Sequence, residues 1–67
     1  MIQLTINGQD RSFETAPTVT QLVSQLALTQ RRIAVERNGE IVPRSRFDET
    51  LLNTGDHLEI VVAVGGG

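Results

Sequence analysis

The sequence contains no cysteine, no tryptophan and no tyrosine, and it has two phenylalanines and one histidine among its 67 residues. Lysine is also absent. The lack of cysteine excludes disulfide bonds, a thiol nucleophile and a cysteine-based zinc site. Domains of this length bury only about 60% of their unfolded surface, and many depend on disulfides or metals. The fold must therefore rest on a small core of Ile, Leu and Val side chains together with Phe13 and Phe47.

Excess charge and long apolar stretches are also lacking. Six basic and eight acidic residues give a net charge of −2, without the dense basic surface that nucleic-acid binding needs. The chain does not open on a basic segment followed by an apolar one, and no apolar run approaches membrane-spanning length. We expect one domain of a soluble, cytoplasmic protein with no nucleic-acid or membrane partner.

Alternation of apolar and polar residues, with turn residues between the runs, indicates the strands. Asn7-Gly8 and Asn38-Gly39 are favoured pairs for tight hairpin turns, because both residue types tolerate positive φ. Five strands are expected on this basis: residues 2–6, 11–14, 33–37, 40–42 and 57–64.

One helix is predicted between the second and third strands. The segment from Thr18 to Gln21 has the form of a capping box, in which a hydroxyl is answered three residues later by an amide. Apolar residues then recur at helical spacing at positions 19, 22, 23 and 26, and residues 27–29 are expected to end the helix. Phe47 and Leu51-Leu52 are predicted to form a one-turn helix that closes the bottom of the core.

The element order predicts the α+β class. A single amphipathic helix needs a sheet face to cover. The first and last strands are the most hydrophobic, so we expect them side by side and parallel at the centre of a mixed sheet. This is a β-grasp, or ubiquitin-like, arrangement of four to five strands curled around one helix, expected over residues 1–64. Residues 65–67 are expected to form a flexible C-terminal glycine tail.

The apolar run at residues 58–64 is followed directly by Gly65, Gly66 and Gly67. Glycine has no Cβ, so such a segment fits a channel too narrow for a side chain. We expect Gly65 and Gly66 to be threaded into the active site of another protein, with the Gly67 carboxylate presented for chemistry. The alternative is a frayed end or a cloning remnant.

Two segments carry a resemblance to a known family. Residues 33–45, IAVERNGEIVPRS, and residues 54–61, TGDHLEIV, followed by Ala63-Val64 and glycines, resemble the sulfur carriers of thiamine biosynthesis, the ThiS family. The resemblance implies a carrier that is not an enzyme. A ThiF-like enzyme would adenylate Gly67 with ATP and magnesium, sulfur relayed from a cysteine desulfurase would give a thiocarboxylate, and a ThiG-like thiazole synthase would accept it. The chain itself would bind no cofactor.

Three other functions are compatible with the same pattern. The small subunit of molybdopterin synthase shares this fold and a Gly-Gly end, although those chains are usually longer and more proline-rich before the glycines. A ubiquitin-like modifier would instead form isopeptide bonds with target lysines. A β-grasp interaction module would bind a partner through its folded domain, and its glycine tail would take part in no reaction.

Other side chains are candidates for binding or catalysis. Val61 and Ala63 fall on the strand face opposite the apolar positions 58, 60 and 62, so we predict that they dock a partner. The arginines at positions 31, 32, 44 and 46 could meet an acidic partner, although such charges are more often solvated. His57 and the pair Asp48-Glu49 match no catalytic or metal-ligand spacing. We therefore expect no catalytic residue and no metal site.

Overall fold

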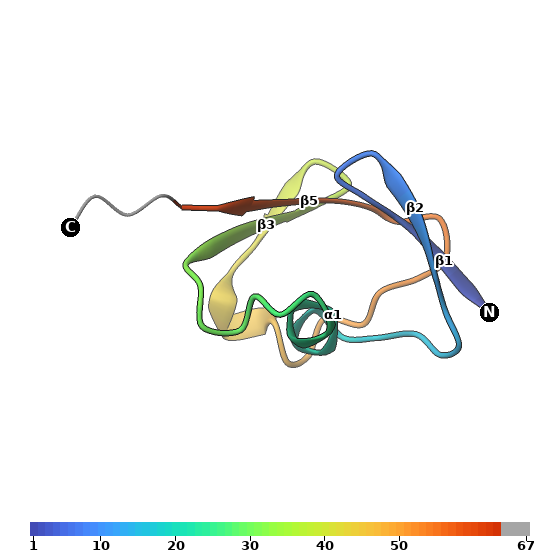
Figure 1. Ribbon diagram of the computed structural model, residues 1–67, viewed down its shortest axis with the longest axis horizontal. Coiled ribbons are helices and arrows are strands. Elements are labelled where there is room, and N and C mark those ends of the chain that lie inside the picture. Colours follow the sequence, from blue (N-terminus) through green and yellow to red (C-terminus); the bar gives the residue numbers. More distant parts are fainter. Residues whose placement is uncertain (64–67) are drawn as a thin grey trace.

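The computed structural model describes residues 1–63, which contain five strands, one α-helix and one turn of 3₁₀ helix. In chain order these are β1 (Ile2–Ile6), β2 (Gln9–Phe13), α1 (Val19–Gln25), β3 (Ile33–Arg37), β4 (Glu40–Val42), η1 (Arg44–Arg46) and β5 (His57–Val62). Figure 1 shows the strands arching over α1. The predicted element order and the α+β class are confirmed.

The first and last strands are neighbours at the centre of the sheet. The strand order is β2-β1-β5-β3-β4, and β1 and β5 run parallel, with Thr5 opposite His57 and Ile6 opposite Leu58. All other pairs are antiparallel. Parallel neighbours need a long crossover connection, which is supplied here by the middle of the chain including α1. The mixed β-grasp sheet predicted from the sequence is therefore correct, with five strands.

Both Asn-Gly pairs form the predicted hairpin turns. Asn7 and Asn38 have a φ of 51°, and Gly8 and Gly39 follow with φ values of 82° and 87°. Positive φ at both central residues matches the right-handed twist of the flanking strands. Each asparagine also uses its side chain to hold β5, as described below.

The helix begins as predicted. The Thr18 hydroxyl accepts from the Gln21 N–H at 3.1 Å, and the Gln21 side-chain oxygen accepts from the Thr18 N–H at 2.9 Å. The buried face of α1 consists of Val19, Leu22 and Val23. The helix ends at Gln25, two residues before Ala27, which adopts a φ of 60°.

The core lies between α1 and the concave face of the sheet. Its buried apolar side chains within residues 1–63 are Leu4, Ile6, Val19, Leu22, Val23, Val35, Phe47, Leu52, Leu58 and Ile60. Most of these side chains come from the three central strands and the helix. The predicted aliphatic core is confirmed and includes Phe47, whereas Phe13 is only partly buried against it.

The predicted one-turn helix over Phe47 and Leu51-Leu52 is wrong. The 3₁₀ turn precedes Phe47, and Leu52 is fully buried whereas 54% of Leu51 is exposed. Residues 50–52 run extended beside residues 17–19: Thr50 O accepts from the Val19 N–H at 3.0 Å, and the Leu52 N–H donates to Pro17 O at 2.9 Å. Extended backbone points neighbouring side chains to opposite sides, so the two leucines cannot both face the core.

The last strand ends at Val62, and the Ala63 N–H donates to Arg32 O at 2.8 Å. Ala63 lies outside the strand, which the sequence predicted to continue through residue 64. Val64, Gly65, Gly66 and Gly67 lie outside the described residues, and so does the predicted tail.

Candidate functional site

The strand that leads to the glycines is held on both of its edges. On one side, β3 pairs with β5 from Arg37 opposite Leu58 to Ile33 opposite Val62. On the other side, β1 pairs only with the first two residues of β5. There the Asn7 N–H donates to Leu58 O at 2.9 Å and continues the pairing.

The Asn7 side chain then replaces a missing strand residue. Its Nδ2 donates to Ile60 O at 3.1 Å, and its Oδ1 accepts from the Ile60 N–H at 2.8 Å. One amide therefore satisfies both backbone groups of Ile60, as a neighbouring strand would. In the sequence this asparagine is recognisable as a turn residue, but no local pattern indicates its contact with β5.

A buried carboxylate fixes the start of the same strand. Asp56 is 8% exposed and accepts from the Asn53 N–H at 2.8 Å, from Asn38 Nδ2 at 3.1 Å and from Arg37 Nε at 2.9 Å. Asn38 Oδ1 also accepts from the His57 N–H at 2.9 Å. This cluster joins the turn before β5 to the β3–β4 hairpin.

The environment of Asp56 favours its charged form. Burial alone would raise the pKa of this carboxyl, but the hydrogen bonds from Asn53, Asn38 and Arg37, with the charge of Arg37, outweigh it and lower the pKa. A carboxylate with every oxygen occupied and a lowered pKa is a structural anchor, not an acid–base catalyst. No local sequence pattern indicates this anchor, because the charged partner of Asp56 lies 19 residues away in the chain.

The outer face of the sheet carries the residues predicted to dock a partner. Val61 is 59% exposed and Ala63 is exposed, whereas Leu58 and Ile60 on the opposite face are buried. Ala34, also exposed, lies directly opposite Val61 on β3. We call Ala34, Val61 and Ala63 the outer patch. Their exposure is as expected, and docking itself stays a prediction.

Two carboxylates lie beside the outer patch. Glu36 and Glu59 are directly opposite each other on β3 and β5, in the row next to Ala34 and Val61. Like charges at such a cross-strand position are unfavourable in the free protein. A cation from a partner would relieve this repulsion, so the outer face suits an apolar surface that carries basic residues.

The pair Asp48-Glu49 contacts other side chains of the domain. Asp48 accepts a hydrogen bond from the Thr20 hydroxyl, and Glu49 lies 3.8 Å from Arg46 in an exposed ion pair. His57 is exposed. Within residues 1–63 no group of three acidic, histidine or cysteine residues is placed to hold a metal ion, and no helix is long and apolar enough to span a membrane.

The architecture defines the class of protein. A five-stranded mixed sheet around one helix, with a central last strand that leads to the chain's terminal glycines, is that of a ubiquitin-like β-grasp protein. The model of the ThiS family matches residues 4–67, and the chain belongs to this family.

Individual relatives agree with the family match. The sulfur carrier protein ThiS of Bacillus subtilis is 37% identical over 65 residues, which are 96% of this chain and 98% of the relative. A crystal structure of the thiamine biosynthesis protein ThiS from Geobacter metallireducens superposes with a TM-score of 0.84 at 36% identity, covering 98% of this chain and 100% of that one.

A thiazole synthase of Paramagnetospirillum magneticum is 47% identical over 66 residues. This chain spans only 20% of the length of that relative. The family match, the Bacillus subtilis relative and the solved structure show that the chain is similar to ThiS sulfur carriers over nearly its whole length.

Proposed function

We propose that the C-terminal carboxylate of Gly67 carries the sulfur, with Gly65 and Gly66 as the slim segment that enters a partner's active site. The observation that supports this most is the central strand β5, held on both edges up to Ile60 and continuing toward the glycines. A firmly held strand followed by residues without side chains can present a terminal group at a distance from the domain.

The proposed chemistry has three steps. The Gly67 carboxylate attacks the α-phosphate of ATP, so that pyrophosphate leaves and an acyl adenylate forms. The outer sulfur of a cysteine persulfide, formed by the desulfurase, attacks the acyl carbon, and AMP leaves to give an acyl disulfide. A thiol, the reductant in this proposal, then attacks the cysteine sulfur of that disulfide, so that the thiocarboxylate leaves and a new disulfide forms. Magnesium and ATP belong to the activating enzyme in this proposal. The chain has no lysine, so no ε-amine of its own can capture the activated carbonyl.

The proposed partners are a ThiF-like adenylating enzyme, a cysteine desulfurase as sulfur source and a ThiG-like thiazole synthase that takes sulfur for thiazole formation in thiamine biosynthesis. The similarity of this chain to part of a protein named thiazole synthase supports the last of these. Because activation consumes ATP, we also propose that the protein acts in the cytoplasm.

The outer patch is the proposed docking surface for the adenylating enzyme. Val61 and Ala63 lie a few residues before the segment that must be delivered, and Glu36 and Glu59 favour basic residues on the partner. An interface centred on exposed apolar residues and rimmed by charge is typical of protein–protein contacts.

The test is adenylation by the cognate activating enzyme. We expect the unmodified chain to support ATP-dependent pyrophosphate release. A version in which the Gly67 carboxylate is capped as an amide should fold and bind but release none. Pyrophosphate release with the amide would contradict the assignment of the carboxylate.

A further inference from the structure

The last strand extends past its neighbour on one side. β1 pairs with β5 only as far as Ile6 opposite Leu58, and residues 59–62 of β5 lie beyond this pair. The chain turns away from β5 at Asn7, which has a φ of 51°. Figure 1 shows β5 continuing past the turn of the β1–β2 hairpin. We call the side of β5 that faces β1, at Val62, the open edge.

The hydrogen bonds of β5 show which backbone groups face the open edge. Ile60 faces the β1 side, because its N–H and C=O both bind the Asn7 side chain. Ala63 faces the β3 side, because its N–H donates to Arg32 O at 2.8 Å. Successive residues of a strand direct their backbone groups to alternate sides. The N–H and C=O of Val62 therefore point to the β1 side, where no strand within residues 1–63 lies beside them.

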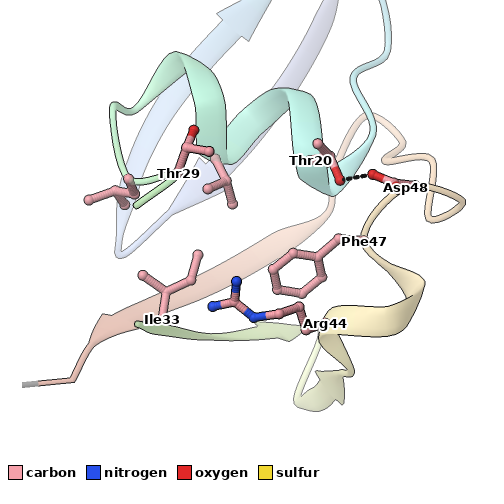
Figure 2. Close-up of a pocket in the computed structure, with 8 residues that line it drawn as sticks. Thr20, Thr29, Ile33, Arg44, Phe47 and Asp48 are labelled. Atoms are coloured by element: carbon pink, nitrogen blue, oxygen red, sulfur yellow. Dashed lines mark hydrogen bonds between the residues drawn. The ribbon is translucent and has the colours of Figure 1, made fainter. Parts of the chain in front are cut away.

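The other edge of β5 is occupied at this level. Val62 is directly opposite Ile33 on β3. Figure 2 shows the Ile33 side chain pointing into the pocket between α1 and η1, below the sheet. A group that binds the backbone of Val62 must therefore approach in the plane of the sheet, from the β1 side.

The sequence protects the outer strands of the sheet but not the open edge. Proteins protect exposed strand edges from pairing with charged residues, proline or short strands. β2 contains Asp10 and Arg11, and the three-residue strand β4 contains Glu40 and is followed by Pro43. Residues 61–63 are Val, Val and Ala, with neither charge nor proline. Such an edge suits an extended peptide, which would satisfy both backbone groups of one residue at once.

The length of the remaining chain indicates which protein supplies this peptide. Residues 64–67 follow Ala63, and a fully extended chain spans at most about 3.6 Å per residue. The Gly67 carboxylate therefore lies within about 14 Å of Ala63. An active site that receives this carboxylate has its entrance beside Val62. Adenylation also requires the carboxylate to be aligned with the α-phosphate, and a strand pair of fixed register provides such alignment.

We propose that an extended segment of the activating enzyme adds to the open edge as a strand, with main-chain hydrogen bonds to the N–H and C=O of Val62. The inference rests on the proposed function, because the partner is the enzyme that adenylates Gly67. The added strand continues the sheet where β1 ends and fixes the register in which the glycines enter the active site. The outer patch is contacted in the same complex, because Val61 and Ala63 flank Val62.

Three variants of the full-length chain test the proposal. Val62→Pro removes the outward N–H and leaves the hydrogen bonds to β3 in place, since proline is tolerated where an N–H faces away from its sheet. Val62→Ala keeps this N–H and controls for the lost side chain. Ser12→Pro is the matched control on β2. Ser12 is opposite Gln3, whose backbone groups bind residues 54 and 55 on the β5 side, so the Ser12 N–H also points outward.

The first measurement is calorimetric binding to the purified activating enzyme, with urea unfolding to show that the variants stay folded. We expect Val62→Pro to raise the Kd by about tenfold or more, because a hydrogen bond is lost and the ring blocks the approaching strand. Val62→Ala and Ser12→Pro should stay within about twofold of the unmodified chain. An unchanged Kd for Val62→Pro, an equal loss for Ser12→Pro, or a loss confined to the thiazole synthase would overturn the proposal.

Amide hydrogen exchange tests the same hydrogen bond without a substitution. The Val62 amide should exchange quickly in the free chain, as the Ser12 amide does, and about tenfold or more slowly in the complex, where Ser12 stays fast. A Val62 amide that is protected in the free chain would overturn the proposal. Protection that rises with the concentration of the free chain would do so as well, because a second copy would then be the occupant.

The two proposals can fail separately, because binding does not require chemistry. An activating enzyme that protects the Val62 amide but does not adenylate the chain refutes the proposed function alone. An enzyme that adenylates the chain and leaves the Val62 amide unprotected refutes the added strand alone.

Discussion

Replacing Asn7 with glycine removes the amide that holds β5 and leaves the turn intact, because glycine accepts the φ of 51° at this position. The lost contacts are the hydrogen bonds to Ile60 O at 3.1 Å and from the Ile60 N–H at 2.8 Å, both partly buried. A hydrogen bond of this kind contributes about 0.5–1.5 kcal/mol, so Asn7→Gly should lower the free energy of unfolding by about 1–3 kcal/mol. Two smaller effects of this substitution on the free energy of unfolding act in opposite directions. Glycine gives the unfolded chain more freedom, which lowers stability, and it relieves the strain of the positive φ, which raises stability. Each effect is below about 1 kcal/mol.

Urea unfolding gives the change in global stability, and amide hydrogen exchange shows where it acts. The Ile60 amide should exchange faster in Asn7→Gly than global unfolding requires, because it loses its acceptor. Asn38→Gly is the matched variant. It removes side-chain contacts with Asp56 and His57 at the other end of β5, and should leave Ile60 exchanging at the global rate. A loss below about 0.3 kcal/mol with normal Ile60 exchange would refute the role assigned to the Asn7 side chain.

Four further substitutions have expected outcomes. Leu58→Ala should cost about 2–5 kcal/mol in urea unfolding, as for truncation of a core aliphatic. Val61→Ala should leave stability nearly unchanged and weaken binding to the activating enzyme, and equal losses at both sites would show that Val61 is core. The pKa of Asp56 in the folded protein is lowered from its ordinary value of 3.8. The contribution of Asp56 to the free energy of unfolding is therefore fully present above pH 3.8, and it is lost as the pH falls through the pKa of the folded protein. The stability difference between the unmodified chain and Asp56→Asn should shrink over that range, and a constant difference would contradict the linkage. Gly66→Val should abolish adenylation while binding survives, because a β-branched side chain widens and stiffens the segment, and full adenylation would exclude a narrow channel.

The elements that the sequence predicted correctly are those with local signals. Alternating residues and the two Asn-Gly pairs predicted the strands and hairpins, and Thr18 with Gln21 predicted the start of the helix. Each of these signals operates over a few residues. The exposure of Val61 followed from the same alternation.

The contacts that the sequence did not predict join residues far apart in the chain. Asn7 binds Ile60 across 53 positions, and Asp56 meets Arg37 across 19. No local pattern distinguishes such an asparagine from an ordinary turn residue. Leu51 was misplaced for a similar reason, because pairing with residues 17–19 imposes extended backbone there. The role of Gly67 came from resemblance to a family and stays a prediction.

The intact mass of the carrier after incubation with the activating enzyme, magnesium, ATP and a sulfur source tests the central claim most directly. Replacement of one carboxylate oxygen by sulfur should raise the mass of the unmodified chain by about 16 Da, and the chain capped as an amide at Gly67 should show no change. The chain has no cysteine that could hold the sulfur elsewhere. A gain of sulfur by the amide-capped chain, or none by the unmodified chain, would contradict transport of sulfur on the C-terminal carboxylate.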